Sequence, residues 1–356
     1  MNSRDKGWLE EIAQSHSTPF GVLLPRVAQA RYFELLDAFH SISPHVRIGY
    51  SVKTNPHPAI LKALDGMESG FECTSLRELD AVSSFSRFLL FNAPCSTDEE
   101  IALALSRSAM IILDSLSQAN QVSRIANGKM LDVGLRLRLD HHRFGFSPDD
   151  FPSLFSILES LKLRVTFLHA HPGTNCTLNQ YRSFMEKVAG VLPLFPHITS
   201  IDIGGGIPGK TSLVERKESL HDYAKIVHEK IGKNVRDKTL ILEPGRFLVE
   251  DSMILVARIQ HLKQIDGTFF GILDAGINIL PRISMSPYRF FPITESGEKR
   301  VSLRLAGPLL FGSDESGQVV GKLTQGDLVG VENIGAYCTE LAWHLSRDAP
   351  PIIVVE

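Results

Sequence analysis

Short apolar runs alternate with longer amphipathic stretches through the first two thirds of the chain. Eight of the apolar runs have the length and composition of buried strands: VRIGYSV, GFEC, RFLLFN, MIILD, DVGLRLRL, RVTFLHAH, ITSIDIG and LILEPG. Helical periodicity separates most of them, as in HPAILKALDGM, SLRELDAVSSF and LNQYRSFMEKVAGVLPLF. Such alternation predicts parallel strands joined by helices, and eight units favour a TIM-like (β/α)8 barrel over an open sheet.

The pattern changes near residue 250. The later runs are β-rich and are separated by Gly, Asp and Pro turns: MILVARIQHLK, TFFGILD, VSLRLAGPLL, DLVGVEN and PIIVVE. We therefore expect an α/β protein in which residues 26–250 form the barrel. Residues 1–25 and 251–356 are expected to form an all-β domain of the β-sandwich or Greek-key barrel type.

Composition narrows the possible partners. The chain has 356 residues, 43% of them hydrophobic and 22% charged, with a net charge of −3 and no basic cluster for nucleic acid. It lacks an apolar run of about 18 residues and a signal-peptide core, so we expect a cytoplasmic protein that does not enter a membrane. Its four cysteines form no CxxC pair. A small molecule is the expected ligand.

A lysine, Lys53, follows the first predicted strand in the stretch GYSVKTNP. In a barrel of this kind the chemistry takes place at the carboxyl ends of the strands, in the loops that follow. A lysine amine there can form a Schiff base with a carbonyl group, most readily when partial burial and neighbouring cations lower its pKa. The alternative is a strand end whose lysine only reaches water.

Two further motifs lie at the ends of the seventh and eighth predicted strands. DIGGGIPG contains the glycines of residues 204–206, and EPGR places Glu243 and Arg246 one strand later. Consecutive glycines let backbone N–H groups approach an anion, and phosphate sites on this barrel commonly use its last loops. The alternatives are a tight turn for the glycines and a surface ion pair for EPGR.

Two histidines, His169 and His171, share one face of the sixth predicted strand in HAHPGTN. A His-x-His pair can ligate zinc or another divalent ion. Metal-dependent hydrolases of this barrel tend to carry the pair on the first strand, with more His and Asp ligands on later strands, a pattern that is absent here. We therefore expect no metal and a histidine that stacks on a flat ring.

A lysine, a phosphate site, a carboxylate and a stacking imidazole together describe one cofactor, pyridoxal 5′-phosphate. Over nearly all its length, the chain also resembles the fold type III decarboxylases of basic amino acids, the ornithine and diaminopimelate decarboxylase family. The matching stretches are YSVKTN, GFECTS, DSLSQ, RFGF, HAHPGT, DIGGGIP, EPGRFLV, LDAGIN, AGPLLFGSD and GAY. Their order and spacing make the match specific, and alanine racemases match the glycine triplet and EPGR less well.

The resemblance implies roles for individual side chains. As catalytic residues, Lys53 would carry the cofactor, His171 would stack on its ring, and Glu243 would pair with the ring nitrogen. Glu72 matches a family aspartate near the lysine and the ring. The other implied cofactor-binding residues are Thr174 and Gly245, with Gly205, Gly206, Arg246 and Tyr337 on the phosphate.

The substrate side of the implied site departs from the family. Leu310 stands where a cysteine delivers a proton to the α-carbon, and Phe311 stands where an acidic residue binds the distal amine of the substrate. Asp314 matches an aspartate that pairs across the dimer with a lysine, which is Arg143 here. Arg282 matches the arginine that diaminopimelate decarboxylases use on a distal carboxylate.

The resemblance therefore implies a decarboxylase that uses pyridoxal 5′-phosphate and forms a homodimer with active sites at the interface. Its expected substrate is an amino acid, or a metabolite containing one, with a distal carboxylate, of the kind found in specialised or siderophore-type metabolism. The alternatives are a racemase or epimerase of the same fold and a non-catalytic homologue of the decarboxylases.

Overall fold

The structure is a computed structural model that describes residues 6–67, 69–85, 88–140, 142–281 and 288–356. It divides into two compact units. The barrel unit comprises Gln29–Pro208 and Leu213–Phe247. The β unit comprises the chain up to Ala28 together with Gly209–Ser212 and Leu248–Glu356.

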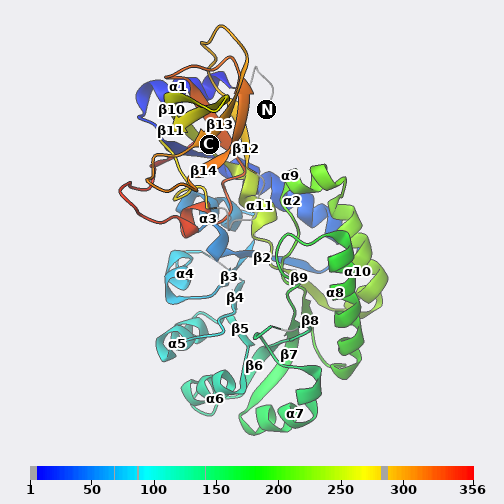
Figure 1. Ribbon diagram of the computed structural model, residues 1–356. Coiled ribbons are helices and arrows are strands. Elements are labelled where there is room, and N and C mark those ends of the chain that lie inside the picture. Colours follow the sequence, from blue (N-terminus) through cyan, green and yellow to red (C-terminus); the bar gives the residue numbers. More distant parts are fainter. Residues whose placement is uncertain (1–5, 68, 86–87, 141, 282–287) are drawn as a thin grey trace. The chain divides into compact units, whose positions relative to one another are not determined.

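Eight parallel strands close into a barrel, as the sequence pattern predicts (Figure 1). They are β2 (Val46–Ser51), β3 (Gly70–Cys73), β4 (Leu89–Phe91), β5 (Met110–Leu113), β6 (Leu131–Arg136), β7 (Leu163–His169), β8 (Ser200–Asp202) and β9 (Thr239–Leu242). The barrel closes where β2 pairs with β9, with Val46 opposite Leu240 and Ile48 opposite Leu242. Because the strands are covered on both faces, their side chains are mostly buried, which explains the nearly continuous apolar runs.

Helices connect successive strands and surround the barrel in Figure 1. They are α3 (Pro58–Asp65), α4 (Leu76–Ala81), α5 (Asp98–Ser106), α6 (Leu116–Ile125), α7 (Phe151–Ser160), α8 (Leu178–Val191), α9 (Lys210–Arg216) and α10 (Leu220–Val235), with α2 (Pro25–His40) before β2. Hydroxyl side chains set several helix starts by accepting a backbone N–H group, as Thr97 does for α5 and Ser219 does for α10. These caps fix where each loop at the mouth of the barrel ends.

The β unit is a mostly antiparallel sheet of eight strands. They are β1 (Phe20–Leu23), β10 (Met253–Ile265), β11 (Thr268–Leu273), β12 (Arg289–Pro292), β13 (Val301–Ala306), β14 (Glu315–Gly321), β15 (Leu328–Glu332) and β16 (Ile352–Val354). Strand β1 pairs antiparallel with β10 and parallel with β16. Helix α1 (Gly7–Ser15) adds Leu9 to a core that includes Phe20, Val22 and Val256.

Three strands of the β unit lie outside the predicted runs, namely β1, β12 and β14. Strand β14 begins with the polar stretch ESGQ, and β12 is a short edge strand that ends at a proline, so neither carries a strong apolar alternation. The remaining short elements are α11 (Arg246–Val249), α12 (Cys338–Leu341), η2 (Val52–Thr54), η3 (Pro148–Asp150), η4 (Leu192–Leu194) and η5 (Glu250–Ser252).

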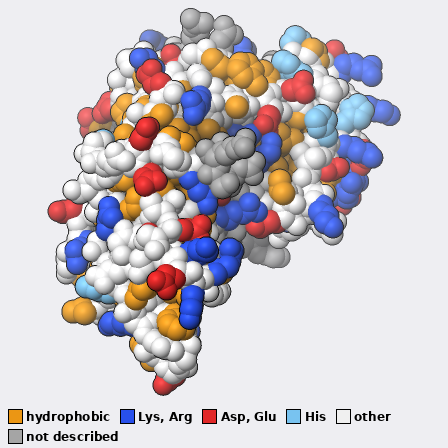
Figure 2. All heavy atoms as spheres, turned by 90° about the horizontal axis from the view of Figure 1, so that it is seen from above, with side chains coloured by type: hydrophobic (Ala, Val, Ile, Leu, Met, Phe, Trp, Pro, Cys, Tyr) orange, Lys and Arg blue, Asp and Glu red, His pale blue; other side chains and the backbone are white. Residues whose placement is uncertain are grey.

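Among the described residues, no helix has both the length and the apolar character needed to span a bilayer. On the face drawn in Figure 2, Lys and Arg side chains alternate with Asp and Glu side chains. Apolar side chains form separate patches between them. This mixed surface agrees with the small net charge of the sequence.

Candidate active site

The carboxyl ends of the barrel strands carry the predicted polar residues. Lys53 lies in η2 directly after β2, and Glu72 lies within β3. The glycine loop follows β8, and Glu243 follows β9. Parallel strands bring these positions to one end of the barrel, so the fold gathers residues that are far apart in the sequence.

Lys53 and Glu72 form an ion pair in which Lys53 Nζ lies 2.6 Å from Glu72 Oε2. The hydroxyl of Ser51 donates to the same oxygen, also at 2.6 Å. Burial acts to raise the pKa of Glu72, but the charge and hydrogen bond of Lys53 outweigh it, and the net pKa is below the usual value. Glu72 is therefore an ionised, buried carboxylate that holds the lysine, whose side chain is 44% exposed.

His171 is half-buried beside the glycine loop. The backbone N–H of Gly205 donates to His171 Nδ1 at 3.3 Å, so a neutral imidazole carries its proton on Nε2. Burial lowers the pKa of His171 well below its usual value, which makes the neutral ring the stable form. A neutral, fixed imidazole is suited to stacking on a flat ring.

The glycine loop packs too tightly for side chains. Gly204 has a φ of +64°, and a Cβ on Gly205 would lie 2.5 Å from the carbonyl oxygen of Glu243. The N–H of Gly204 donates to Asp202 Oδ1 at 2.8 Å, and the N–H of Glu243 donates to the carbonyl of Gly204 at 2.8 Å. The loop is thus tied to both β8 and the end of β9.

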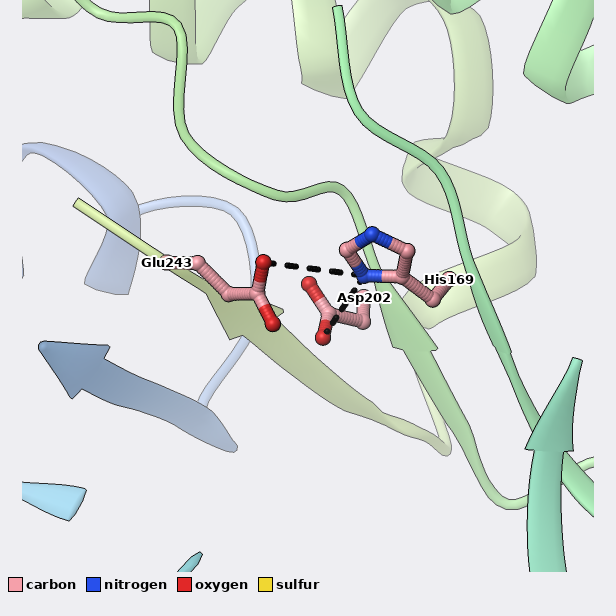
Figure 3. A group of neighbouring side chains, drawn as sticks. All are labelled: His169, Asp202 and Glu243. Carbon is pink, nitrogen blue, oxygen red and sulfur yellow. Dashed lines mark ion pairs between the residues drawn. The ribbon is translucent and has the colours of Figure 1, made fainter. Parts of the chain in front are cut away.

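Three buried side chains, His169, Asp202 and Glu243, point toward one another from β7, β8 and the end of β9 (Figure 3). His169 Nδ1 lies 3.2 Å from Asp202 Oδ2 and 3.7 Å from Glu243 Oε2. Burial raises the pKa of Asp202 to about 7 against the hydrogen bonds with the Gly204 N–H and with the side chain of Glu243. Burial and the charge of Asp202 raise the pKa of Glu243 well above its usual value.

The structure does not pair the two histidines in the way that the metal hypothesis requires. Among the described residues, the potential ligand atoms that lie within 4.8 Å of one another belong to His169, Asp202 and Glu243, whereas His171 Nδ1 faces Gly205. Sequence reasoning missed Asp202 as a partner, although its place at the end of an apolar strand was a usable signal. It also missed Asn92, whose amide nitrogen lies 3.4 Å from His169 Nε2.

The residues at this end of the barrel fit pyridoxal 5′-phosphate. Glu243 Oε1 is buried and accepts no hydrogen bond among the described residues. The buried hydroxyl of Thr54 also makes no hydrogen bond among them. A buried carboxylate oxygen without a donor is costly, so it suits a group that brings an N–H, such as a protonated pyridine ring. Lys53 and the glycine loop lie at the same end of the barrel and supply an amine and backbone N–H groups.

Other predicted cofactor-site residues lie in different surroundings. Thr174 is exposed in the loop after β7, and Arg246 is buried at the start of α11. Gly245 packs on Thr54, since a Cβ there would lie 2.1 Å from the threonine hydroxyl. Tyr337 belongs to the β unit, where it has a φ of +66° and precedes α12.

The predicted substrate residues are in the β unit or outside the described residues. Leu310 is fully exposed and Phe311 is half exposed, whereas Asp314 is only 3% exposed. Asp314 accepts backbone N–H groups from Ile277 and Leu309, each at 2.8 Å, so it braces its own loop, a role that the sequence did not suggest. Arg282 lies outside the described residues.

Comparison with known proteins shows the family of the chain. Residues 30–250 match the family model described as pyridoxal-dependent decarboxylase, pyridoxal binding domain. Diaminopimelate decarboxylase of Haemophilus influenzae is 26% identical over 96% of this chain and 88% of its own length. The Aquifex aeolicus enzyme of the same name is 25% identical over 98% of this chain and 89% of its own.

Solved structures of relatives share the fold, and two of them serve as examples. One is diaminopimelate decarboxylase from Helicobacter pylori complexed with L-lysine, with a TM-score of 0.87, 24% identity, and coverage of 98% of this chain and 94% of the other. The second is lysine/ornithine decarboxylase from Vibrio vulnificus complexed with putrescine, with a TM-score of 0.86, 20% identity, and coverage of 100% and 99%. The family model confirms the predicted cofactor, and the chain belongs to the pyridoxal-dependent amino-acid decarboxylases.

Proposed function

We propose that Lys53, His171 and Glu243 bind pyridoxal 5′-phosphate at the carboxyl end of the barrel. When bound, this cofactor supplies a protonated pyridine ring that withdraws electrons from the α-carbon of an amino acid. The observation that carries the proposal is the buried Glu243 Oε1, which has no donor among the described residues and suits the ring N–H. His171 would lie against the ring face, and Lys53 would hold the cofactor covalently.

The phosphate would be held by the loops after β8 and β9. Gly205 and Gly206 offer backbone N–H groups there, and Arg246 adds a buried guanidinium. Thr174, Gly245 and Tyr337 would complete this region by the family resemblance.

Proton delivery falls to Lys53 in this proposal. Leu310, in place of the family cysteine, has no proton to give. His171 is a poor acid near neutral pH because burial lowers its pKa well below the usual value. Lys53 is paired with the ionised Glu72, which would stabilise a proton on Nζ whenever the amine is not bound to the cofactor.

We propose a substrate that carries a carboxylate away from its reacting centre. Phe311 removes the acidic partner of a distal ammonium, and Arg282 matches an arginine used on a distal carboxylate. The curated relatives named above are diaminopimelate decarboxylases, whose substrate has such a group.

A homodimer is part of the proposal because apolar side chains of the β unit are uncovered. Leu310 is fully exposed, and the half-exposed Phe311 ring makes an edge contact with exposed Trp343 at a centroid distance of 6.0 Å. A second copy of the chain would cover this patch and receive Leu310 and Phe311 near its site.

The cofactor assignment is tested with Lys53→Ala. The variant is expected to lose the visible absorbance that borohydride bleaches, together with at least about a thousandfold of its activity. Lys62→Ala is the matched control, since Lys62 is exposed on α3. A Lys53→Ala protein that keeps a borohydride-sensitive absorbance would contradict the assignment.

The substrate class is tested by carbon dioxide release from lysine, ornithine, diaminopimelate and conjugates that carry a distal carboxylate. Wild-type protein is expected to prefer the carboxylated compounds, and Arg282→Gln should reduce kcat/KM for these compounds by about a hundredfold. Equal or better turnover of plain lysine or ornithine would rule the proposal out.

A further inference from the structure

Asn92 has one orientation that satisfies its neighbours. Arg136 Nη1 lies 3.1 Å from Asn92 Oδ1, and a guanidinium can only donate, so the oxygen of the amide must face it. The guanidinium is held in turn, since Arg136 Nε lies 3.8 Å from Asp114 and its Cζ lies 4.6 Å from the centre of the Phe144 ring. The NH2 group of Asn92 therefore faces His169 Nε2 at 3.4 Å.

This orientation decides which nitrogen of His169 carries the proton. An amide NH2 group only donates, so His169 Nε2 must accept, and the proton of the neutral ring is on Nδ1. Burial lowers the pKa of His169, which agrees with a neutral ring. A protonated Nδ1 offers no lone pair to a metal, although the three side chains have the composition of a metal site.

His169 Nδ1 lies beside two carboxyl groups without making a hydrogen bond to either. Nδ1 lies 3.2 Å from Asp202 Oδ2 and 3.7 Å from Glu243 Oε2 (Figure 3). Asp202 is itself fixed because its Oδ1 accepts the N–H of Gly204. The opposite tautomer would turn a lone pair toward both carboxyl groups and would repel each of them where it is ionised.

We propose that His169 is a positioning residue for Glu243, and that Arg136 and Asn92 set its tautomer. The Nδ1–H group attracts Glu243 Oε2 and leaves Oε1 free to receive the ring nitrogen of the cofactor. This inference rests on the role proposed above for Glu243. It assigns a function to four side chains that contact one another in turn from β6 to the end of β9. They are Arg136, Asn92, His169 and Glu243.

The decisive variant is Asn92→Asp, which keeps the shape of the side chain and leaves His169 in place. An aspartate would accept from Nε2–H and so turn the lone pair of Nδ1 toward Glu243. With pyridoxal 5′-phosphate labelled with ¹⁵N in the ring, we expect the ¹⁵N resonance to move toward that of an unprotonated pyridine. The dissociation constant of the cofactor is expected to rise about tenfold.

Two substitutions at His169 complete the test. His169→Leu should behave as Asn92→Asp does, whereas His169→Asn should retain most of the wild-type resonance because its amide nitrogen replaces the Nδ1 donor. Circular dichroism and thermal unfolding confirm that each variant is folded, and Asn92→Asp decides alone if a His169 variant is not.

Glu243→Gln separates this inference from the proposed function. If Glu243→Gln leaves the ¹⁵N resonance unchanged, the proposed role of Glu243 is wrong and the inference falls with it. If Glu243→Gln moves the resonance but Asn92→Asp leaves both the resonance and the dissociation constant at wild-type values, only the role of His169 is overturned.

Discussion

Glu72 and Asp202 are both buried carboxyl groups of the barrel unit, yet their surroundings shift the two pKa values in opposite directions. Glu72 has a cation beside it, so its net pKa is below the usual value despite burial. Among the residues that the structure describes, no cation contacts Asp202, and burial raises its pKa to about 7, above the usual 3.8. Of the two, only Glu72 stabilises the folded state when it is ionised.

The cofactor-free protein should therefore lose stability as the pH rises from about 4 to about 7. In this range the unfolded chain has released the proton of Asp202 while the folded chain retains it, so the folded state binds more protons. Asp202→Asn should flatten this decline. The measurement is the urea midpoint of both proteins at several pH values, and an equal slope in the two would show that Asp202 ionises normally.

Glu72 contributes with the opposite sign. Its stabilisation is complete above the usual pKa of 4.5 and is lost as the pH falls below that value, because the proton that it then binds breaks the pair with Lys53.

Leu310 offers a substitution with little structural cost. Its side chain is fully exposed, so Leu310→Cys should change the melting temperature of the protein by less than about 2 °C. If the family cysteine position delivers a proton in this protein too, the variant should raise the yield of amine relative to aldehyde. Following carbon dioxide, amine and aldehyde together checks this, and an unchanged ratio would argue against a role for the position.

The loop after β8 is tightly constrained by packing. Gly205→Ala would place a methyl group 2.5 Å from the carbonyl oxygen of Glu243, so we expect a loss of about 1–3 kcal/mol in unfolding free energy and weaker cofactor binding. Gly190→Ala is the control, since Gly190 is exposed in α8 and a Cβ there meets nothing within 4 Å. It should gain up to about 1 kcal/mol, and denaturant unfolding compares the two variants.

Strand periodicity was enough to predict the barrel, because strands covered on both faces read as apolar runs wherever they occur. The positions of Lys53 and the glycine loop at the ends of strands could be predicted for the same reason, since each directly follows such a run. The contacts of Asn92 and Asp202 with His169 could not, because they join β4, β7 and β8 across the barrel and have no spacing along the chain. Asp314 was assigned to substrate, but its backbone partners at Ile277 and Leu309 depend on a loop that only the fold creates.

At the scale of the whole molecule, the exposed patch of the β unit predicts self-association. Phe311→Glu should shift the protein from dimer toward monomer in sedimentation and should lower activity with it. Phe33→Glu serves as control, since Phe33 is an equally exposed phenylalanine on α2 of the barrel unit. A wild-type protein that sediments as a fully active monomer would refute the dimer.

The pairing of β1 has a consequence for biosynthesis. Phe20 and Val22 leave the ribosome early, but their partners Val256 and Ile254 on β10 are made only after the entire barrel. Until then this apolar strand has an unpaired edge, which is a site for aggregation or for chaperone capture. Nascent chains stalled before β10 should therefore be held by chaperones, and charged substitutions in β1 should release them.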